Sequence, residues 1–156
     1  MRVFLLLMLV LSGTAGATSA RPSSLWLSLE DTGTQLGAWG DRGAVTPHID
    51  ALARDGIRFT NAYATAPVCA VSRAALITGV HAVALGAQFM RTDIIRPEQI
   101  KPFPWYLRQA GYFTTNRKKT DYQFEAPSET WDLDGGGHRD WEERRDAGQP
   151  FFSVIN

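Results

Sequence analysis

Cysteine is almost missing from this chain of 156 residues, because Cys69 is the only one. The sequence can therefore form no internal disulfide. An excess of charge is missing too, since 16 Lys and Arg residues balance 16 Asp and Glu residues. With no basic patch and no polybasic run, the sequence gives no indication of binding to nucleic acid or to an anionic lipid surface.

Long apolar runs are also scarce. The run from Val3 to Leu11 is too short for the roughly 20 residues that cross a bilayer, which argues against a membrane anchor. Arg2 precedes it and small residues follow from Ser12 to Ala20, which is typical of a secretory signal peptide cleaved after Ala17 or Ala20. The sequence thus predicts a signal peptide at residues 1–20, an exported protein (periplasmic or secreted) and no stable membrane span.

Apolar runs alternate with helical patterns through the rest of the chain. This alternation indicates an α/β fold with a largely parallel sheet flanked by helices. The expected strands are residues 25–29, 57–63, 112–115 and 151–155, and the expected helices are residues 46–56, 72–79 and 103–110. A long polar loop is expected between Phe124 and Pro150.

The helix at residues 46–56 has the clearest boundary signals. Thr46 can cap its start, Pro47 suits its first position, and Gly56 suits its end. Ile49 and Leu52 would share one face of this helix.

The single cysteine has an unusual setting. In an oxidising compartment a lone cysteine is buried, paired with another chain, or chemically special. Cys69 comes just before an expected helix, where free backbone N–H groups and the positive end of the helix dipole favour an anion. Arg73 follows about one turn later, and its planar guanidinium suits an oxyanion. The plainer interpretation is a small buried cysteine in a turn.

The segment from Pro67 to Gly79 resembles the signature of the formylglycine-dependent sulfatases, in which Cys-x-Pro-Ser-Arg is followed by a short helix and Thr-Gly. Val71 stands where that family has proline. The positions that match are Cys69, Ser72, Arg73, Thr78 and Gly79.

This resemblance implies a covalent mechanism. In the family, a formylglycine-generating enzyme oxidises the cysteine to an aldehyde before export, and the aldehyde is hydrated to a geminal diol. One hydroxyl attacks sulfur, and the other later expels sulfate by collapsing back to the aldehyde. The resemblance assigns the nucleophile to Cys69 and charge stabilisation to Arg73.

The segment from Leu25 to Gly33 is similar to the first strand of the family, which ends in two acidic ligands of a divalent cation, usually calcium. Glu30 and Asp31 take those positions, with Glu30 where aspartate is usual. Carboxylates at the carboxyl end of a parallel strand suit a crevice site, and hard oxygen ligands suit calcium. The resemblance therefore implies a site for Ca²⁺ formed by Glu30, Asp31 and the modified Cys69. Taken alone, the two residues are equally a pair of turn acids.

The segment from Ala110 to Tyr122 matches a third family region, in which Gly-Tyr-x-Thr leads to a lysine that contacts the sulfate. Lys119 falls on that lysine, and Asp121 falls where a histidine is usual. The alternative is that Lys118 and Lys119 are solvated on an exposed turn.

Together, these matches imply that residues 21–156 are the N-terminal part of an alkaline-phosphatase-like sulfatase domain, truncated at this length. The implied reaction is hydrolysis of a sulfate ester or sulfamate on a small molecule or glycan. Two alternatives stay open: a phosphodiesterase or phosphonate hydrolase of the same superfamily, and an inactive truncated fragment.

Overall fold

The structure is a computed structural model that describes residues 21–135 and 140–156. The predicted signal peptide, residues 1–20, lies outside the described residues. Within the described part of the chain, no helix has the length and apolar character needed to cross a membrane.

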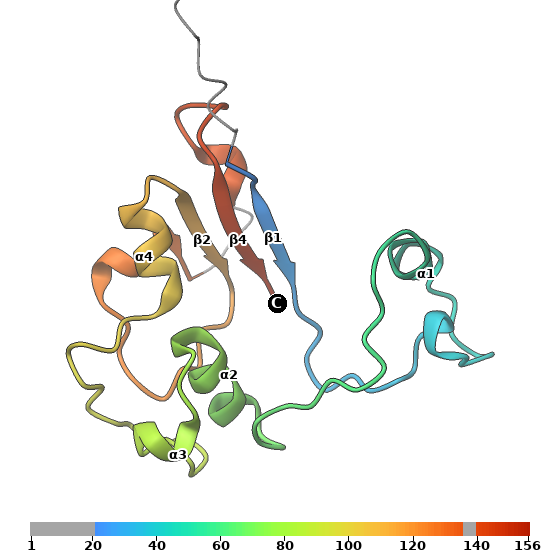
Figure 1. Cartoon of the computed structure of the whole chain (residues 1–156), viewed down its shortest axis with the longest axis horizontal. Helices are drawn as coiled ribbons and strands as arrows, with labels where there is room; N and C mark the ends of the chain where they lie inside the picture. Colours follow the sequence, from blue (N-terminus) through green and yellow to red (C-terminus); the bar gives the residue numbers. More distant parts are fainter. Residues whose placement is uncertain (1–20, 136–139) are drawn as a thin grey trace, which may run out of the picture.

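A parallel sheet forms the centre of the molecule (Figure 1). Its strands are β1 (Ser24–Leu27), β2 (Phe113–Arg117), β3 (Leu133–Asp134) and β4 (Phe151–Ile155), in the order β1-β4-β2-β3. Every pairing is parallel. The prediction of a largely parallel α/β sheet is therefore confirmed.

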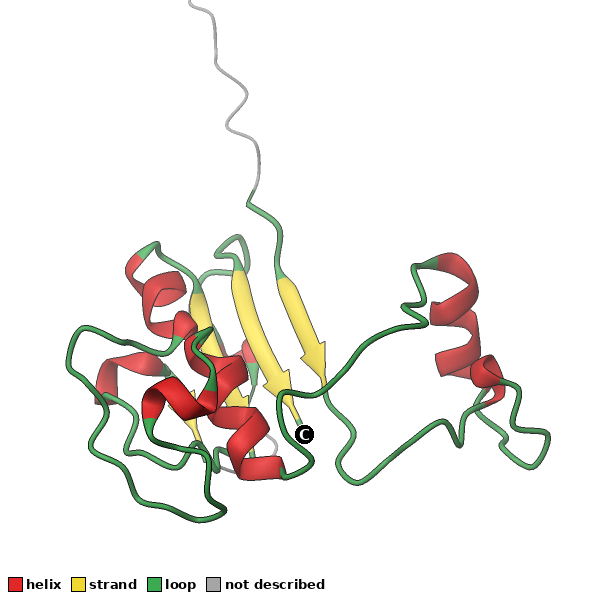
Figure 2. Ribbon diagram, turned by 60° about the horizontal axis from the view of Figure 1, so that its bottom comes forward, coloured by secondary structure: helices red, strands yellow, loops and turns green. Residues whose placement is uncertain are grey.

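The helices are of two kinds. The α-helices are α1 (Pro47–Asp55), α2 (Cys69–Thr78), α3 (Ala82–Leu85) and α4 (Phe103–Gln109), and the 3₁₀ turns are η1 (Gly37–Trp39), η2 (Ser128–Thr130) and η3 (Trp141–Glu143). In Figures 1 and 2, α2, α3 and α4 gather beside the sheet, whereas α1 and η1 stand apart from it.

The hydrophobic core lies between the sheet and helices α2 to α4. Phe152 of β4 is central, because its ring packs edge-on against Phe103 at 5.0 Å and stacks on Trp131 at 6.3 Å. On the helix side, Val71, Ala74 and Ile77 of α2 join the same cluster. None of residues 21–69 is buried, although Trp26, Ala66 and Val68 are partly buried against this cluster.

Polar side chains fill part of the sheet interior. Thr115 of β2 and Ser153 of β4 are fully buried and in register, and the Thr115 hydroxyl donates to the Ser153 Oγ at 2.7 Å. This bond satisfies two buried hydroxyls that would otherwise cost free energy.

Helix α1 begins and ends where the sequence predicts. Pro47 takes the first position, and the Gly56 N–H donates to the Leu52 carbonyl at 2.9 Å. The side chain of Thr46 does not cap the helix; it accepts from the Gly37 N–H at 2.9 Å and donates to Asp50 at 3.0 Å.

Three further expectations are wrong. Residues 57–63 form no strand, because that segment has no neighbouring strand, and Ile57 and Phe59 remain 82% and 71% exposed. The helix expected at Ser72 begins at Cys69. The expected loop between Phe124 and Pro150 contains η2, β3 and η3, since β3 extends the sheet beside β2.

Candidate active site

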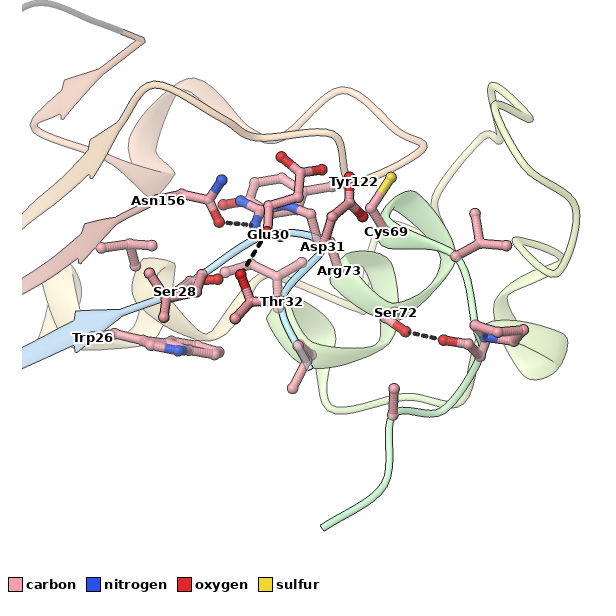
Figure 3. Close-up of a pocket in the computed structure, with 18 residues that line it drawn as sticks. Trp26, Ser28, Glu30, Asp31, Thr32, Cys69, Ser72, Arg73, Tyr122 and Asn156 are labelled. Carbon is pink, nitrogen blue, oxygen red and sulfur yellow. Dashed lines mark hydrogen bonds between the residues drawn. The ribbon is translucent and has the colours of Figure 1, made fainter. Parts of the chain in front are cut away.

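A pocket of about 430 Å³ lies where the end of β1 meets the start of α2 (Figure 3). The carboxyl ends of parallel strands are the usual place for ligand sites in such sheets. Four predicted site residues line it: Glu30, Asp31, Cys69 and Arg73.

Cys69 is the first residue of α2, directly after the extended Val68. It is half-buried, and its Sγ donates to the Asp121 Oδ2 at 3.4 Å. Asp121 thus lies beside Cys69 in the structure, although the two residues are 52 positions apart in the sequence. Cys69 therefore lies at the positive end of the α2 dipole and next to the carboxylate of Asp121.

Ser72 and Thr78 explain the spacing of the signature. The Ser72 hydroxyl donates to the Ala66 carbonyl at 2.6 Å, which ties the approach segment to the first turn of α2. The Thr78 hydroxyl donates to the Ala74 carbonyl at 2.7 Å, and Gly79 ends the helix in the left-handed conformation, with φ of 68°. Both ends of α2 are therefore fixed by side chains or backbone of the motif.

Arg73 connects three parts of the site. Its Nε donates to the Thr120 carbonyl at 2.8 Å, its Nη1 donates to Asn156 Oδ1 at 3.0 Å, and its Nη2 donates to the Lys119 carbonyl. The guanidinium also lies 5.6 Å from the centre of the Tyr122 ring. Arg73 therefore holds the turn at residues 119–120 against the end of β4.

Tyr122 is buried under this guanidinium. Burial raises the pKa of its phenol to about 12, because the charged phenolate is poorly solvated there, while the nearby Arg73 lowers it by a smaller amount. The side chain is therefore neutral at physiological pH, and it serves as a packing surface for Arg73.

Lys119 faces the acidic end of β1. Its Nζ is ion-paired with Glu30 and lies 3.5 Å from Asp121 Oδ2. The hydrogen bond to Glu30 raises the pKa of Lys119, and the same bond lowers the pKa of Glu30. Lys119 is therefore not a solvated lysine on a free turn.

The backbone of the segment that carries Lys119 is unusual. Lys118, Asp121 and Gln123 have φ of 76°, 48° and 61°, in the left-handed region that side chains rarely adopt. Strained backbone of this kind is concentrated at functional sites. In this segment the side chain of Lys119 points toward Glu30 and the side chain of Asp121 points toward Cys69.

The predicted cation ligands are only partly assembled. Asp31 lines the pocket and is exposed, and Glu30 is engaged by Lys119. Across residues 21–135 and 140–156, no three His, Cys, Asp or Glu side chains come together to hold a metal ion. The oxygen donors suit a hard cation, but the described residues do not complete a site for one.

Sequence reasoning missed two residues of the site. Asn156 follows β4 directly and lines the pocket, and Tyr122 supports Arg73 from below. The position of Asn156, just after an apolar strand of a parallel sheet, is a signal that could have identified it.

Comparison with known proteins gives the family. The Sulfatase family profile matches residues 22–153. The chain belongs to the sulfatase family. An ulvan-active sulfatase of Formosa agariphila is 41% identical over 148 residues, which cover 87% of this chain and 24% of that protein. Human N-sulphoglucosamine sulphohydrolase is 36% identical over 103 residues, which cover 64% of this chain and 20% of that protein.

Solved structures give the fold. A protein whose structure was solved in complex with its substrate, D-glucosamine-2-N,6-O-disulfate, superposes with a TM-score of 0.73 at 24% identity over 86% of this sulfatase chain and 33% of that one. A second, a possible sulfatase from Bacteroides thetaiotaomicron, superposes with a TM-score of 0.68 at 19% identity over 85% and 34% of the two chains. The fold is the alkaline-phosphatase-like fold of sulfatases, and the chain spans about a fifth to a third of the length of these relatives.

Proposed function

We propose that this chain supplies the nucleophilic part of a sulfatase that hydrolyses a sulfate ester or sulfamate, with Cys69 converted to formylglycine. The observation that carries the proposal is the position of Cys69: it is the first residue of α2, lines the pocket, and lies within 3.4 Å of Asp121. Membership of the sulfatase family supports it.

The chemistry follows from a hydrated aldehyde at position 69. A maturation enzyme of the formylglycine-generating class supplies the oxidation of the thiol. One hydroxyl of the diol then attacks sulfur, and the alcohol or amine of the substrate leaves with a proton. The second hydroxyl loses its proton, the bond between the diol carbon and the sulfate oxygen breaks, and the aldehyde is restored together with free sulfate.

The neighbouring side chains have distinct parts in this proposal. Asp121 is placed to accept a hydrogen bond from a hydroxyl on residue 69. Lys119 is not one of the residues that line the pocket, but it is ion-paired with Glu30, which does line it, and so holds a positive charge next to the place where the sulfate would carry negative charge. Arg73 contributes its charge and holds the Lys119 turn in place.

The proposal also includes a divalent cation, for which calcium is the preferred candidate. Glu30, Asp31 and the modified residue 69 would be its ligands in this chain, and it would offset the charge of the sulfate group. Calcium takes about six to eight oxygen ligands. The described residues do not supply that number, so no step above depends on the ion.

We further propose that the substrate is a sulfated glycan and that the protein is exported. Two relatives are named for sulfated carbohydrates, and one structural neighbour was solved with a glucosamine disulfate. The pocket volume is within the usual range of small-molecule sites, about 300 to 1,000 Å³.

N-terminal sequencing of secreted protein should give a start near Thr18 or Arg21; an intact Met1 in the membrane fraction would contradict export.

The test of the central proposal is direct. The chain is co-expressed with a formylglycine-generating system, and the peptide containing residue 69 is analysed by mass spectrometry with an aldehyde-reactive tag. We expect at least partial conversion, and no tag on Cys69→Ala. A wholly unmodified thiol would remove the nucleophile from the proposal.

A further inference from the structure

The hydrogen bonds from Arg73 hold the first half of the turn at residues 118–123. They reach the carbonyls of residues 119 and 120, which precede Asp121. Beyond those carbonyls the backbone is left-handed at Asp121 and again at Gln123, with φ of 48° and 61°. Glutamine rarely adopts this conformation, and such backbone persists where the surrounding structure holds it. The second half of the turn therefore needs contacts of its own.

Gln123 makes three hydrogen bonds to the segment that follows α3. Its side-chain Nε2 donates to the Ala87 carbonyl at 2.6 Å, and its side-chain Oε1 accepts the Thr92 N–H at 3.0 Å. Its main-chain carbonyl accepts the Ile94 N–H at 2.9 Å. The side chain is buried, so protein groups satisfy both ends of its amide away from water.

The segment that Gln123 binds belongs to the same packed unit as Cys69. Ala87 is fully buried, and its N–H donates to the Ala82 carbonyl at 2.8 Å, which ties it to α3. Helix α3 follows α2 in the chain, and both helices contribute to the core cluster. Cys69 begins α2, and Asp121 lies two residues before Gln123. Gln123 therefore fastens the second half of the turn to the unit that carries the cysteine.

We propose that Gln123 is a positioning residue, which keeps the carboxylate of Asp121 beside residue 69 by bonding the turn at residues 118–123 to the segment at residues 87–94. Gln123 does not line the pocket, so it acts through Asp121. This role rests on the proposed function, in which Asp121 accepts a hydrogen bond from residue 69. Its test uses the unmodified thiol, so that a failure of positioning and a failure of conversion to formylglycine are separate results.

The experiment measures how fast iodoacetamide alkylates Cys69 at one fixed pH, in the full chain produced without a formylglycine-generating system. The thiolate is the nucleophile, and a carboxylate held beside it disfavours that charged form. Asp121→Asn should therefore raise the rate by about threefold, the size expected for a partly exposed charge interaction. Gln123→Gly should raise it by a similar factor, because it frees the carboxylate. Glycine adopts φ of 61° without strain, so this variant loses the side-chain bonds but can keep the backbone conformation.

A double-mutant cycle separates positioning from a general loosening of the fold. In the Asp121→Asn background, Gln123→Gly should raise the rate no further, because the carboxylate that it positions is already gone. Loosening alone would expose Cys69 and raise the rate in both backgrounds.

The matched control is Gln149→Gly. The Gln149 Nε2 also donates to a backbone carbonyl, that of Gly111 at 3.1 Å, but this residue precedes β4 and does not line the pocket. The control should change the alkylation rate by less than about twofold. An equal rise from Gln123→Gly in both backgrounds, no rise from it in the original chain, or no effect of Asp121→Asn would overturn the proposal.

Discussion

Arg73 shows how one side chain can organise a site that is distributed along the chain. Its planar fork reaches two backbone carbonyls of one turn and the side chain of Asn156, 83 positions away. Lysine carries the same charge on a single ammonium and cannot reproduce this geometry. The contribution of Arg73 to the site is therefore one of shape as well as charge.

Arg73→Lys should accordingly destabilise the chain by about 2 kcal/mol, since hydrogen bonds from charged groups contribute roughly 1.5 to 3 kcal/mol. Urea unfolding followed by tryptophan fluorescence measures the loss. Arg54→Lys is the control, because Arg54 forms only an exposed ion pair with Asp55 and should change stability by less than about 0.5 kcal/mol. Equal stability of the two variants would show that Arg73 does not hold the turn.

The Glu30–Lys119 pair gives a prediction about pH. Glu30 titrates below its ordinary value of 4.5, so its favourable contribution is present above pH 4.5 and is lost as pH falls through the lowered pKa. The pKa of Lys119 is raised above 10.5, so its contribution is present below pH 10.5 and is lost as pH rises through that raised pKa. The pair is therefore complete between these two values.

Lys119→Met should return the pKa of Glu30 toward 4.5, because the hydrogen bond that lowers it is gone. Carbon-detected NMR titration of the glutamate side chains measures the change. Lys101→Met is the control, since Lys101 lies over the Trp105 ring and not at the pocket. A Glu30 pKa that stays low in Lys119→Met would mean that the ion pair does not control it.

For single residues, the sequence predicted four of the residues that line the pocket but did not predict the contacts that the site residues make. Glu30, Asp31, Cys69 and Arg73 stand within recognisable motifs and at element boundaries, so their convergence could be expected. The contact between Cys69 and Asp121 depends on the left-handed backbone at residue 121; aspartate tolerates this conformation, but tolerance alone does not show that a given aspartate adopts it.

At the scale of elements, Val71 gives the clearest test. It is the third residue of α2 and is buried, and helical bonding begins at the next residue, from the Ser72 N–H to the Val68 carbonyl at 3.0 Å. A proline at position 71 therefore removes no helical bond, and first-turn positions tolerate its ring.

Val71→Pro should fold with a loss of less than about 1.5 kcal/mol, as for other swaps of similar volume. It should also increase conversion of Cys69 to formylglycine if, as proposed, a maturation enzyme reads this segment, because proline restores the residue that the sulfatase signature has at position 71. Mass spectrometry of the residue 69 peptide measures the converted fraction. Val83→Pro in the exposed first turn of α3 is the control and should leave conversion unchanged. Equal conversion in all three proteins would contradict a role for Val71.

The accuracy of prediction differed between elements for a physical reason. Helix α1 was located from Pro47 and Gly56, which act through local backbone geometry. The strand expected at residues 57–63 failed, because a strand needs a partner and none of the described residues supplies one there. The two-residue β3 was missed, since its pairing with β2 compensates for the weak strand preference of its sequence.

For the whole molecule, we expect no measurable sulfatase activity from this chain alone, even after conversion of Cys69. The described residues bring no metal-binding group of three together, and the chain spans only 24% of its ulvan-active relative. Losing one preorganised charge-stabilising group typically costs a hundredfold or more in rate.

The assay uses purified, converted protein with calcium and a chromogenic aryl sulfate. Cys69→Ala provides the blank. Turnover clearly above that blank would show that this chain is catalytically sufficient.

The buried pair of hydroxyls, Thr115 of β2 and Ser153 of β4, favours one pairing register of these two strands. If β4 slid by one residue, Thr115 would face Phe152 or Val154, and two hydroxyls would be left unpaired in a dry interior. The pair thus penalises misaligned sheets during folding. The correct alignment also places Asn156 beside Arg73. A shift of the register at Thr115 and Ser153 would therefore separate Asn156 from Arg73 and disrupt the pocket at the far end of β4.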